Sequence, residues 1–236
     1  MSIDATIGVD SPPIAANLPG ALAGHPGHVM TSLPIRCTCG EVHGTLEGVA
    51  DGRVGLRLSC LCVDCQTYAH LLGRADEILD ADGGTDVVQV APARVRIDEG
   101  LRNLRCTRLT DKGLFRWNAR CCDSPIGNTV SSRRVPFIGV LTSCLDLSAD
   151  ERDARLGPVR ASVNLPAGLE RRPANAGFGA QLSVVLRSIG LLSGAYLRGT
   201  HRPHPFFGDD GTPIVTPEVA DADEVAAARA RITRSA

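Results

Sequence analysis

Lysine, aromatic residues and net charge are scarce in this sequence. Lys112 is the single lysine among 236 residues, aromatic residues make up 3%, and the formal net charge is -1. Nucleic-acid-binding surfaces combine clustered positive charge with aromatic side chains that stack on bases, so the composition argues against a nucleic-acid partner. The balanced charge also provides no general attraction to an anionic membrane. We interpret the excess of arginine as a composition bias, and do not assign Arg133-Arg134 or Arg171-Arg172 as phosphate sites.

The N-terminal segment lacks the features of a secretory signal. It has an early aspartate, two adjacent prolines and no basic stretch followed by an apolar one. We therefore expect a cytoplasmic protein whose thiols stay reduced. Residues 1–32 are rich in Ala, Gly and Pro and have no hydrophobic periodicity, which predicts a flexible lead-in. The sequence also lacks a Gly-rich phosphate loop and any clear Ser-His-Asp arrangement.

Residues 33–148 consist mainly of short strand-like segments. In RVGLRLSC, at 53–60, apolar and polar residues alternate, as in a strand with one buried face. Similar runs occur at 86–90, 93–97, 101–109, 113–119 and 136–145. The segment 63–72 alone has the pattern of a short helix. The sequence therefore predicts a mainly β domain over 33–148.

Residues 149–236 are predicted to be a helical C-terminal extension. Helical patterns occur at 148–157, 177–199 and 224–233, and residues 201–217 are loop-like. The run at 177–199 is apolar, but Arg187 divides it into stretches shorter than the roughly 18 residues of a membrane span. We predict no membrane span and a helix packed on the body of the protein. The alternative is a helix that contacts a membrane surface or a partner, including a second copy of the chain.

The nine cysteines carry most of the chemical information. An odd number in a reducing compartment argues against a disulfide framework. Seven of them form three groups: Cys37 with Cys39; Cys60 with Cys62 and Cys65; Cys121 with Cys122. The spacing favours metal ligation, while core packing of these thiols, or a redox pair at Cys62 and Cys65, stays open. Cys106 and Cys144 stand alone and are predicted to be small core residues.

The three groups predict two kinds of site. Thiolates a few residues apart can share one zinc ion, and Gly40 suits a tight turn directly after the first pair. The first and third groups together could form a closed four-ligand site that joins the ends of the β region. The second group lies between a strand end and a helix start, whose amide groups would stabilise thiolates. Three ligands would leave a fourth position free, as in catalytic zinc sites.

Histidines and acids near these groups are weaker candidates. His43 and His70 each follow a cysteine group and could be a spare ligand or hydrogen-bond partner, but an ordinary surface or core histidine is the favoured interpretation for both. Metal binding by His201 and His204 in the loop at 201–217 is a weaker alternative. Asp64 could orient a ligand or act as a base, but a solvated acid at a helix start is the simpler interpretation.

The ordered motifs resemble a known family. Cys-x-Cys-Gly, then Cys-x-Cys-x-x-Cys after a strand, then a late cysteine before DSPIGN resemble the glutathione-dependent formaldehyde-activating enzymes, a family that includes the centromere protein V domain. The resemblance covers about residues 35–131. It implies a β-tent, in which small antiparallel sheets are pinned by zinc. It also implies a structural zinc held by Cys37, Cys39 and the late cysteines, and a second, more labile zinc at Cys60, Cys62 and Cys65.

The resemblance implies a reaction as well. It suggests a carbon-sulfur lyase that forms or cleaves S-hydroxymethylglutathione from formaldehyde and glutathione, or that acts with another small thiol. The alternative function is a non-catalytic, zinc-stabilised binding module. Nucleic-acid binding, by analogy with the centromere member, is opposed by the charge and the low aromatic content. Catalytic and substrate-binding residues are not assigned.

The chain departs from the family pattern at two places. The family's late motif is Cys-x-x-Cys-Gly, and alignment on the following proline places Cys122 at its second cysteine and Ala119 at its first. Cys121, a water or a histidine must then supply the missing ligand. Residues 66–76 also lack the small Gly-Ser segment that is common after the second group, which predicts an altered pocket beside the second zinc.

Overall fold

The computed structural model describes residues 32–48, 55–166 and 172–232 of the chain. The predicted lead-in therefore lies outside the described residues, apart from its last residue. Arg53 and Val54, the first two residues of the predicted strand at 53–60, also lie outside them.

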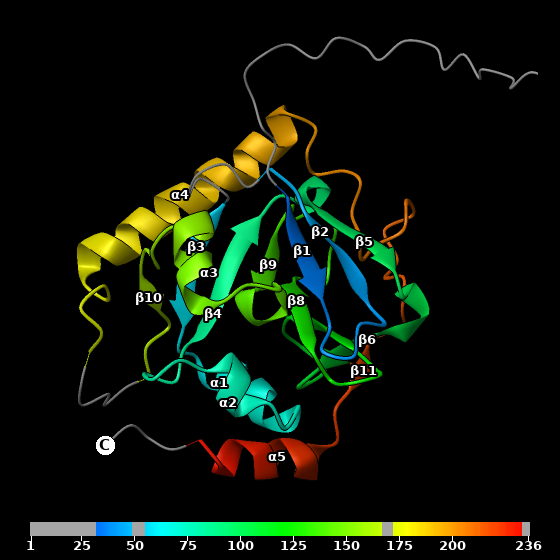
Figure 1. Ribbon diagram of the computed structural model, residues 1–236, viewed down its shortest axis with the longest axis horizontal. Coiled ribbons are helices and arrows are strands. Elements are labelled where there is room, and N and C mark those ends of the chain that lie inside the picture. The colour runs from blue at the N-terminus through cyan, green and yellow to red at the C-terminus, as the bar shows by residue number, and fades with distance from the viewer. Residues whose placement is uncertain (1–31, 49–54, 167–171, 233–236) are drawn as a thin grey trace, which may run out of the picture.

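Two β-sheets form the body of the protein, which confirms the mainly β prediction (Figure 1). The smaller sheet is antiparallel and has the order β1-β2-β5, with bounds Leu33–Arg36, His43–Leu46 and Val95–Glu99. The larger sheet has the order β10-β3-β4-β9-β8-β7-β6-β11. Its strands, in chain order from β3, are Leu56–Cys60, Thr85–Val90 (β4), Leu104–Arg108 (β6), Phe115–Ala119 (β7), Pro125–Thr129 (β8), Ile138–Leu141 (β9), Ser162–Val163 (β10) and Glu218–Val219 (β11).

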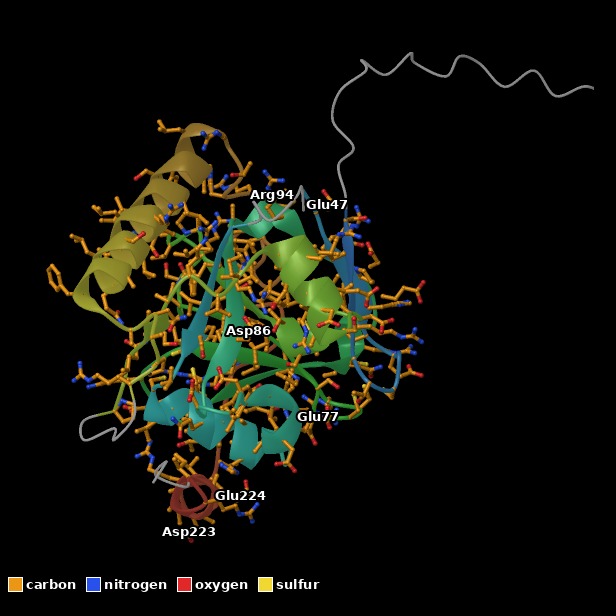
Figure 2. The ribbon with its side chains drawn as sticks, turned by 60° about the vertical axis from the view of Figure 1, so that its left-hand side comes forward. Glu47, Glu77, Asp86, Arg94, Asp223 and Glu224 are labelled. Carbon is orange, nitrogen blue, oxygen red and sulfur yellow. The ribbon has the colours of Figure 1, made fainter. Side chains whose placement is uncertain are left out.

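The helices surround these sheets. They are α1 (Val63–Leu71), α2 (Ala75–Ile78), α3 (Ala149–Leu156), α4 (Phe178–Leu197) and α5 (Ala222–Ala230), with short 3₁₀ turns η1 (Pro92–Arg94), η2 (Leu101–Asn103) and η3 (Thr142–Cys144). The helices predicted at 63–72, 148–157 and 177–199 are confirmed. Helix α5 begins before the predicted position 224, because the Asp221 side chain caps it by accepting from the amides of Asp223 and Glu224, which lie at the lower end of the view in Figure 2.

The main core lies between the two sheets. Leu33 and Ile35 of β1 contribute to the same buried cluster as Trp117 of β7. The Trp117 ring is fully buried and stacks on Phe206 with 4.5 Å between ring centroids. Phe206 and Phe207 belong to the segment 201–217, which the sequence predicts as a loop. That loop therefore supplies core side chains, which its Pro and Gly content did not reveal.

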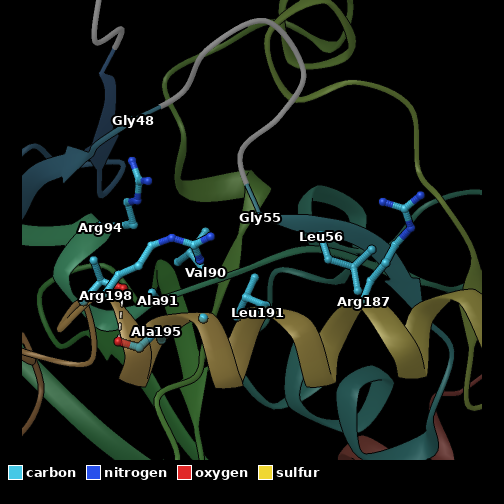
Figure 3. Close-up of a pocket in the computed structure, with 12 residues that line it drawn as sticks. Gly48, Gly55, Leu56, Val90, Ala91, Arg94, Arg187, Leu191, Ala195 and Arg198 are labelled. Atoms are coloured by element: carbon cyan, nitrogen blue, oxygen red, sulfur yellow. Dashed lines mark hydrogen bonds between the residues drawn. The ribbon is translucent and has the colours of Figure 1, made fainter.

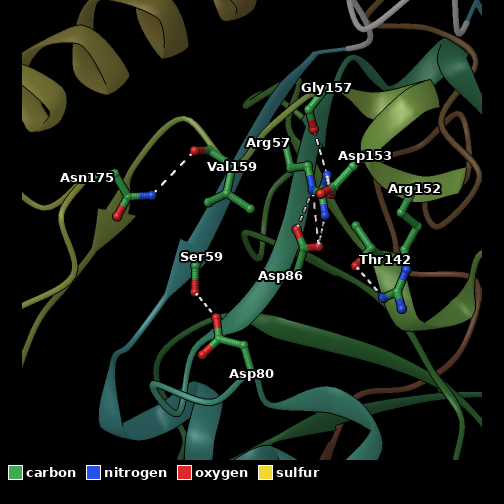
Figure 4. Close-up of polar contacts among 10 residues, drawn as sticks. All are labelled: Arg57, Ser59, Asp80, Asp86, Thr142, Arg152, Asp153, Gly157, Val159 and Asn175. Carbon is green, nitrogen blue, oxygen red and sulfur yellow. Dashed lines mark hydrogen bonds and ion pairs between the residues drawn. The ribbon is translucent and has the colours of Figure 1, made fainter. Parts of the chain in front are cut away.

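Strand β3 is buried on both faces, which corrects the prediction of one polar, solvent-facing side. Arg57 donates hydrogen bonds to both carboxylate oxygens of Asp86 on β4, to Asp153 on α3, and to the carbonyl of Gly157 (Figure 4). Ser59 donates to Asp80 at 2.7 Å. A buried guanidinium is stable when its hydrogen-bond donors are paired. These acids therefore allow α3 to cover the face of β3 that the alternating sequence pattern predicts to be exposed to water.

The C-terminal segment joins the larger sheet. Strand β10 pairs in parallel with β3, and β11 pairs in parallel with β6. Helix α5 packs on α1, where Val225 joins a cluster with Tyr68 and Ala69. The division of the chain at about residue 148 stays a prediction.

Helix α4 lies along one side of the molecule (Figure 1). Only Val184, Gly194 and Ala195 of this helix are buried, so the predicted packing on the body holds for one narrow stripe. Phe178 and Leu197, at the two ends, are 84% and 88% exposed. By length and composition α4 is apolar enough to cross a membrane, a test that single helices of other proteins also pass. The absence of a membrane span stays a prediction.

Candidate metal centres

The first and third cysteine groups come together in one cluster. Cys37 and Cys39 lie on the turn between β1 and β2, and Cys121 and Cys122 lie on the turn between β7 and β8. The Sγ atom of Cys39 lies 3.1 Å from that of Cys121, and the Sγ of Cys37 lies 3.5 Å from that of Cys39. All four sulfur atoms lie within 4.8 Å of one another. This four-sulfur cluster could hold a metal ion and links the two sheets.

Local backbone geometry prepares both turns. Gly40 has φ +82°, and its amide donates to the carbonyl of Cys37, as expected for a tight turn after the first pair. The amide of Val42 donates to the Cys37 sulfur at 3.2 Å. In the second turn Asp123 has φ 53°, an uncommon conformation for a residue other than glycine. Asp123 directly follows the two adjacent cysteines, whose sulfur atoms both belong to the cluster.

The question of the missing ligand at Ala119 has a geometric answer. Ala119 is fully buried in β7, opposite Leu104 of β6. The Cys121 sulfur lies 3.9 Å from that of Cys37 and 3.8 Å from that of Cys122. Cys121 therefore supplies the fourth sulfur atom of this cluster. Among the described residues, no histidine joins this group.

Two thiols of the four-sulfur cluster have opposite pKa shifts. Burial raises the pKa of Cys37, although the Val42 amide opposes this effect. Burial would also raise the pKa of Cys122, but hydrogen bonds from Ser124, Thr38 and the backbone outweigh it and lower the pKa to about 5. Ser124 Oγ lies 3.2 Å from the Cys122 sulfur. Without a metal, the negative charge of the cluster is therefore favoured on Cys122.

The second group forms a separate three-sulfur cluster. Cys60 ends β3, and Cys62 is the N-cap of α1, where its sulfur accepts from the amide of Cys65 at 3.3 Å. The Sγ of Cys60 lies 3.5 Å from that of Cys62 and 3.6 Å from that of Cys65. The predicted strand end and helix start are confirmed. This cluster could also hold a metal ion.

Residues that the sequence reasoning missed surround the three-sulfur cluster. Arg116 of β7 is only 3% exposed; its guanidinium lies 3.9 Å from the Cys65 sulfur and 5.1 Å from the centre of the Tyr68 ring. Asn164, next to β10, donates to the Cys60 sulfur at 3.4 Å. It has φ 55°, so its backbone adopts a rare conformation where its side chain reaches the cluster. Two features of the sequence could have indicated these residues. Arg116 lies within a strand whose other residues are buried, and Asn164 directly follows a buried strand.

The surroundings favour a negative charge on Cys60. Hydrogen bonds from the thiols of Cys62 and Cys65, and from the Asn164 amide, lower the pKa of Cys60 despite its burial. The pKa of Cys65 is raised, first because its thiol donates to Cys60 and further because of burial. Metal binding would displace the remaining thiol protons, because the thiolate is the ligand form of cysteine.

The other candidates are members of neither cluster. The described histidines belong to neither group; His43 lies 3.4 Å from Glu99, and burial lowers the pKa of His204 to about 4. Asp64 pairs with Arg229 of α5 at 3.1 Å. Cys106 and Cys144 are buried in the main core, which confirms their prediction as core residues.

Comparisons with known proteins place the chain in a family without an assigned activity. Residues 29–218 match a family of unknown function, DUF6151. No curated protein matches the chain. A crystal structure of a Rhodobacter sphaeroides protein is similar at 20% identity and a TM-score of 0.36, covering 54% of this chain and 97% of that chain. A similarity of that extent supports no argument about activity.

Proposed function

The chain belongs to the family of unknown function DUF6151, and we propose from its cysteine clusters that it binds two zinc ions, one structural and one chemically active. The observation that carries this proposal is the gathering of seven free thiols into two groups, each with all its sulfur atoms within 4.8 Å. The four-sulfur cluster would hold the structural ion. The three-sulfur cluster would hold the second ion and leave one position for a ligand.

The sulfur positions suit zinc. Thiolates around a tetrahedral zinc lie about 3.8 Å apart, given Zn–S bonds of about 2.3 Å. The closest sulfur pairs of the two clusters are separated by 3.1 Å to 3.9 Å. All-sulfur ligand sets favour zinc, Cu(I) or iron–sulfur clusters over magnesium or calcium, and four cysteines on two turns are a common arrangement for structural zinc. Metal analysis distinguishes zinc from the other two.

We propose that the second site binds glutathione or another small thiol and acts as a carbon-sulfur lyase on its formaldehyde adduct. The motif resemblance to the formaldehyde-activating enzymes supports this choice. In the forward direction the thiolate sulfur attacks the formaldehyde carbon, the carbon-sulfur bond forms, and the carbonyl electron pair moves to oxygen, which takes a proton. Zinc, when bound, would stabilise the thiolate and polarise the carbonyl.

Residues of the chain would support that chemistry around the open position. Arg116 supplies a buried positive charge beside Cys65, which offsets the excess negative charge of three thiolates on one dication. Asn164 orients Cys60 through its amide. Cys62 is the most accessible of the three cysteines, so the side of the cluster near Cys62 is where a small thiol would enter.

The second candidate function is a zinc-stabilised binding module without catalysis. The exposed apolar side chains of α4, from Phe178 to Leu197, favour it, because soluble proteins seldom leave such a continuous apolar face uncovered. In this alternative both zinc ions would support the fold, and α4 would contact a partner or a second copy.

Metal analysis combined with a thiol titration tests the proposal. We expect two zinc ions per chain in the protein purified under reducing conditions, binding of glutathione at millimolar concentration or below, and turnover of S-hydroxymethylglutathione. A Cys62→Ser variant should keep one zinc and lose turnover, while a Cys144→Ser variant should keep both. Zinc binding without glutathione binding or turnover would reject the lyase and leave the binding module. A chain without bound metal would reject both.

A further inference from the structure

A cleft of about 370 Å³ lies between α4 and the ends of β3 and β4 (Figure 3). Three arginines line it, Arg94 of η1 together with Arg187 and Arg198 of the α4 region, and its described lining includes no acidic side chain. We propose that this cleft binds a small molecule through a phosphate group carried as a monoester. The inference is independent of the cysteine clusters, because none of their residues lines the cleft.

Among the described residues, none of the three arginines has an acidic partner. Within the described part of the chain, no carboxylate forms an ion pair with any of the three, whereas Arg57 and Arg96 each pair with two carboxylates and Arg105 pairs with one. Glu47, one residue before the lining Gly48, pairs with Arg96 at 2.7 Å instead; Figure 2 shows it at the same end of the molecule as Arg94. Like charges around one concave surface repel one another and attract an anion of high charge.

Glycines keep the space in which two of the guanidinium groups lie. A Cβ atom on Gly48 would come within 1.4 Å of Arg94 Nη1, and one on Gly194 would come within 2.5 Å of Arg198 Nη1. Gly194 lies inside α4, where glycine is a poor helix former. A side chain at 194 would require the end of the Arg198 side chain to shift from its present position.

Hydrogen bonds hold the two walls of the cleft at a set distance. The amide of Ala93, next to Arg94, donates to the carbonyl of Thr200, just after α4, at 3.0 Å. Ser188 in the middle of α4 donates to the Gln89 side chain of β4 at 2.9 Å. The backbone segments that carry Arg94 and Arg198 are therefore already joined in the free protein. A ligand that binds both arginines would lose less binding free energy in bringing these segments together.

The shape and chemistry of the cleft favour a phosphate ester. A guanidinium donates two parallel hydrogen bonds to phosphate oxygens, and a dianion can satisfy more than one guanidinium. Arg94 and Arg198 lie towards one end of the cleft and Arg187 towards the other. Leu56, Val90 and Leu191 provide apolar lining between them, which suits the organic part of an ester. The volume lies within the usual range of small-molecule sites.

Calorimetric titration of the zinc-loaded, full-length protein with inorganic phosphate and with phenyl phosphate tests this inference. We expect binding at millimolar concentration or below in low salt, tighter for the ester, and weaker as ionic strength rises. Arg94→Gln and Arg198→Gln should each weaken it at least tenfold, while Arg102→Gln, which changes an exposed arginine on η2, should leave it unchanged. Vesicles of phosphatidic acid and of phosphatidylcholine form a second arm. Arginine-dependent binding to phosphatidic acid alone would identify a lipid headgroup as the source of the phosphate.

A matched pair of glycine substitutions separates the cleft from general charge. Gly194→Ala should displace Arg198 and weaken phosphate binding several-fold, while Gly190→Ala, whose Cβ would meet nothing within 4 Å, should leave it unchanged. Both changes favour the helix, so circular dichroism should show a folded protein in each case. Absence of binding to every probe, or equal binding by the parent and all arginine and glycine variants, would overturn the inference.

Discussion

The two cysteine clusters are built in opposite ways. The four-sulfur cluster joins two turns separated by more than 80 residues, and two of its cysteines, Cys39 and Cys121, are exposed. The three-sulfur cluster comes from a single segment at 60–65, and two of its cysteines are buried. One cluster lies between two sheets near the surface, and the other lies inside the protein at the start of α1.

The net charge of each metal-bound cluster explains why the difference in burial between the two clusters matters. Four thiolates around a dication leave a net charge of -2, which water can stabilise near the surface. Three thiolates leave -1 in a buried place, where the neighbouring guanidinium of Arg116 can offset it. In the proposed function, the first cluster would serve the fold and the second would serve chemistry. Five experiments would break or sharpen this distinction.

Loss of the four-sulfur cluster should have the largest effect. We expect Cys37→Ser to lower the free energy of unfolding by about 4 kcal/mol or more, because it removes a buried ligand of the proposed ion that would join the sheets. Urea denaturation with zinc present measures this. Cys144→Ser, at a buried cysteine outside both clusters, is the control and should cost about 1–2 kcal/mol. Equal losses in the two variants would contradict a structural role for the cluster.

Loss of the three-sulfur cluster should change metal content more than stability. Cys62→Ser should reduce the zinc content from two ions per chain to one, and lower the free energy of unfolding by only about 1–2 kcal/mol, because the four-sulfur cluster still joins the sheets. Elemental analysis and urea denaturation of the same preparation check both values. A loss of stability as large as that of Cys37→Ser would remove the distinction between the clusters.

The charge of Arg116 should affect one cluster only. Arg116→Met should weaken zinc at the three-sulfur cluster by about 10–100-fold, the usual range for residues that support metal ligands. Arg116→Lys keeps the charge and should recover part of the affinity. Competition with a chromophoric chelator measures both sites separately, and the four-sulfur cluster is the internal control. Equal weakening of both sites would indicate a general loss of fold.

The Asn164 hydrogen bond should have a smaller effect on the same site. Asn164→Gly removes the amide that donates to Cys60 but tolerates the φ of 55°, so the backbone should remain in place. We expect zinc affinity at the three-sulfur cluster to fall by up to about tenfold. With cobalt in place of zinc, the sulfur-to-metal absorption band should shift. An unchanged band and affinity would show that Asn164 does not act on the cluster.

Thiol alkylation of the metal-free protein should show the smallest effect, a difference in reaction rate between individual cysteines. The pKa of Cys122 is lowered to about 5, so its thiolate is populated above that pH and should react with iodoacetamide before Cys106 and Cys144 do. Burial raises the pKa of Cys106 and of Cys144 to about 12, and neither should react at pH 7. The stabilisation from ionised Cys122 is complete above the ordinary thiol pKa and is lost as the pH falls towards 5. Mass spectrometry of partly alkylated protein orders the rates; equal rates at all three would contradict the shifts.

The local structural elements could be predicted from the sequence. The helix at 63–72 and the turn at Gly40 were predictable because their signals lie within a few residues. Strand β3 was predictable in position but not in its burial, because the acids that pair with Arg57 come from β4 and α3. Strand β8 and the core role of Phe206 escaped prediction, because a Pro- and Gly-rich pattern does not show what a segment packs against.

The sequence by itself determined the chemical inventory of this protein. Seven cysteines in three short groups, a glycine after the first pair and a helix start within the second are local properties, because ligand spacing and turn geometry depend on adjacent residues. Only the tertiary structure decided that Cys121 joins Cys37 in one cluster, that Arg116 and Asn164 reach the second cluster across 51 and 104 residues, and that three arginines line one cleft. Those contacts depend on sheet register and helix docking, which bring together residues that no local pattern relates.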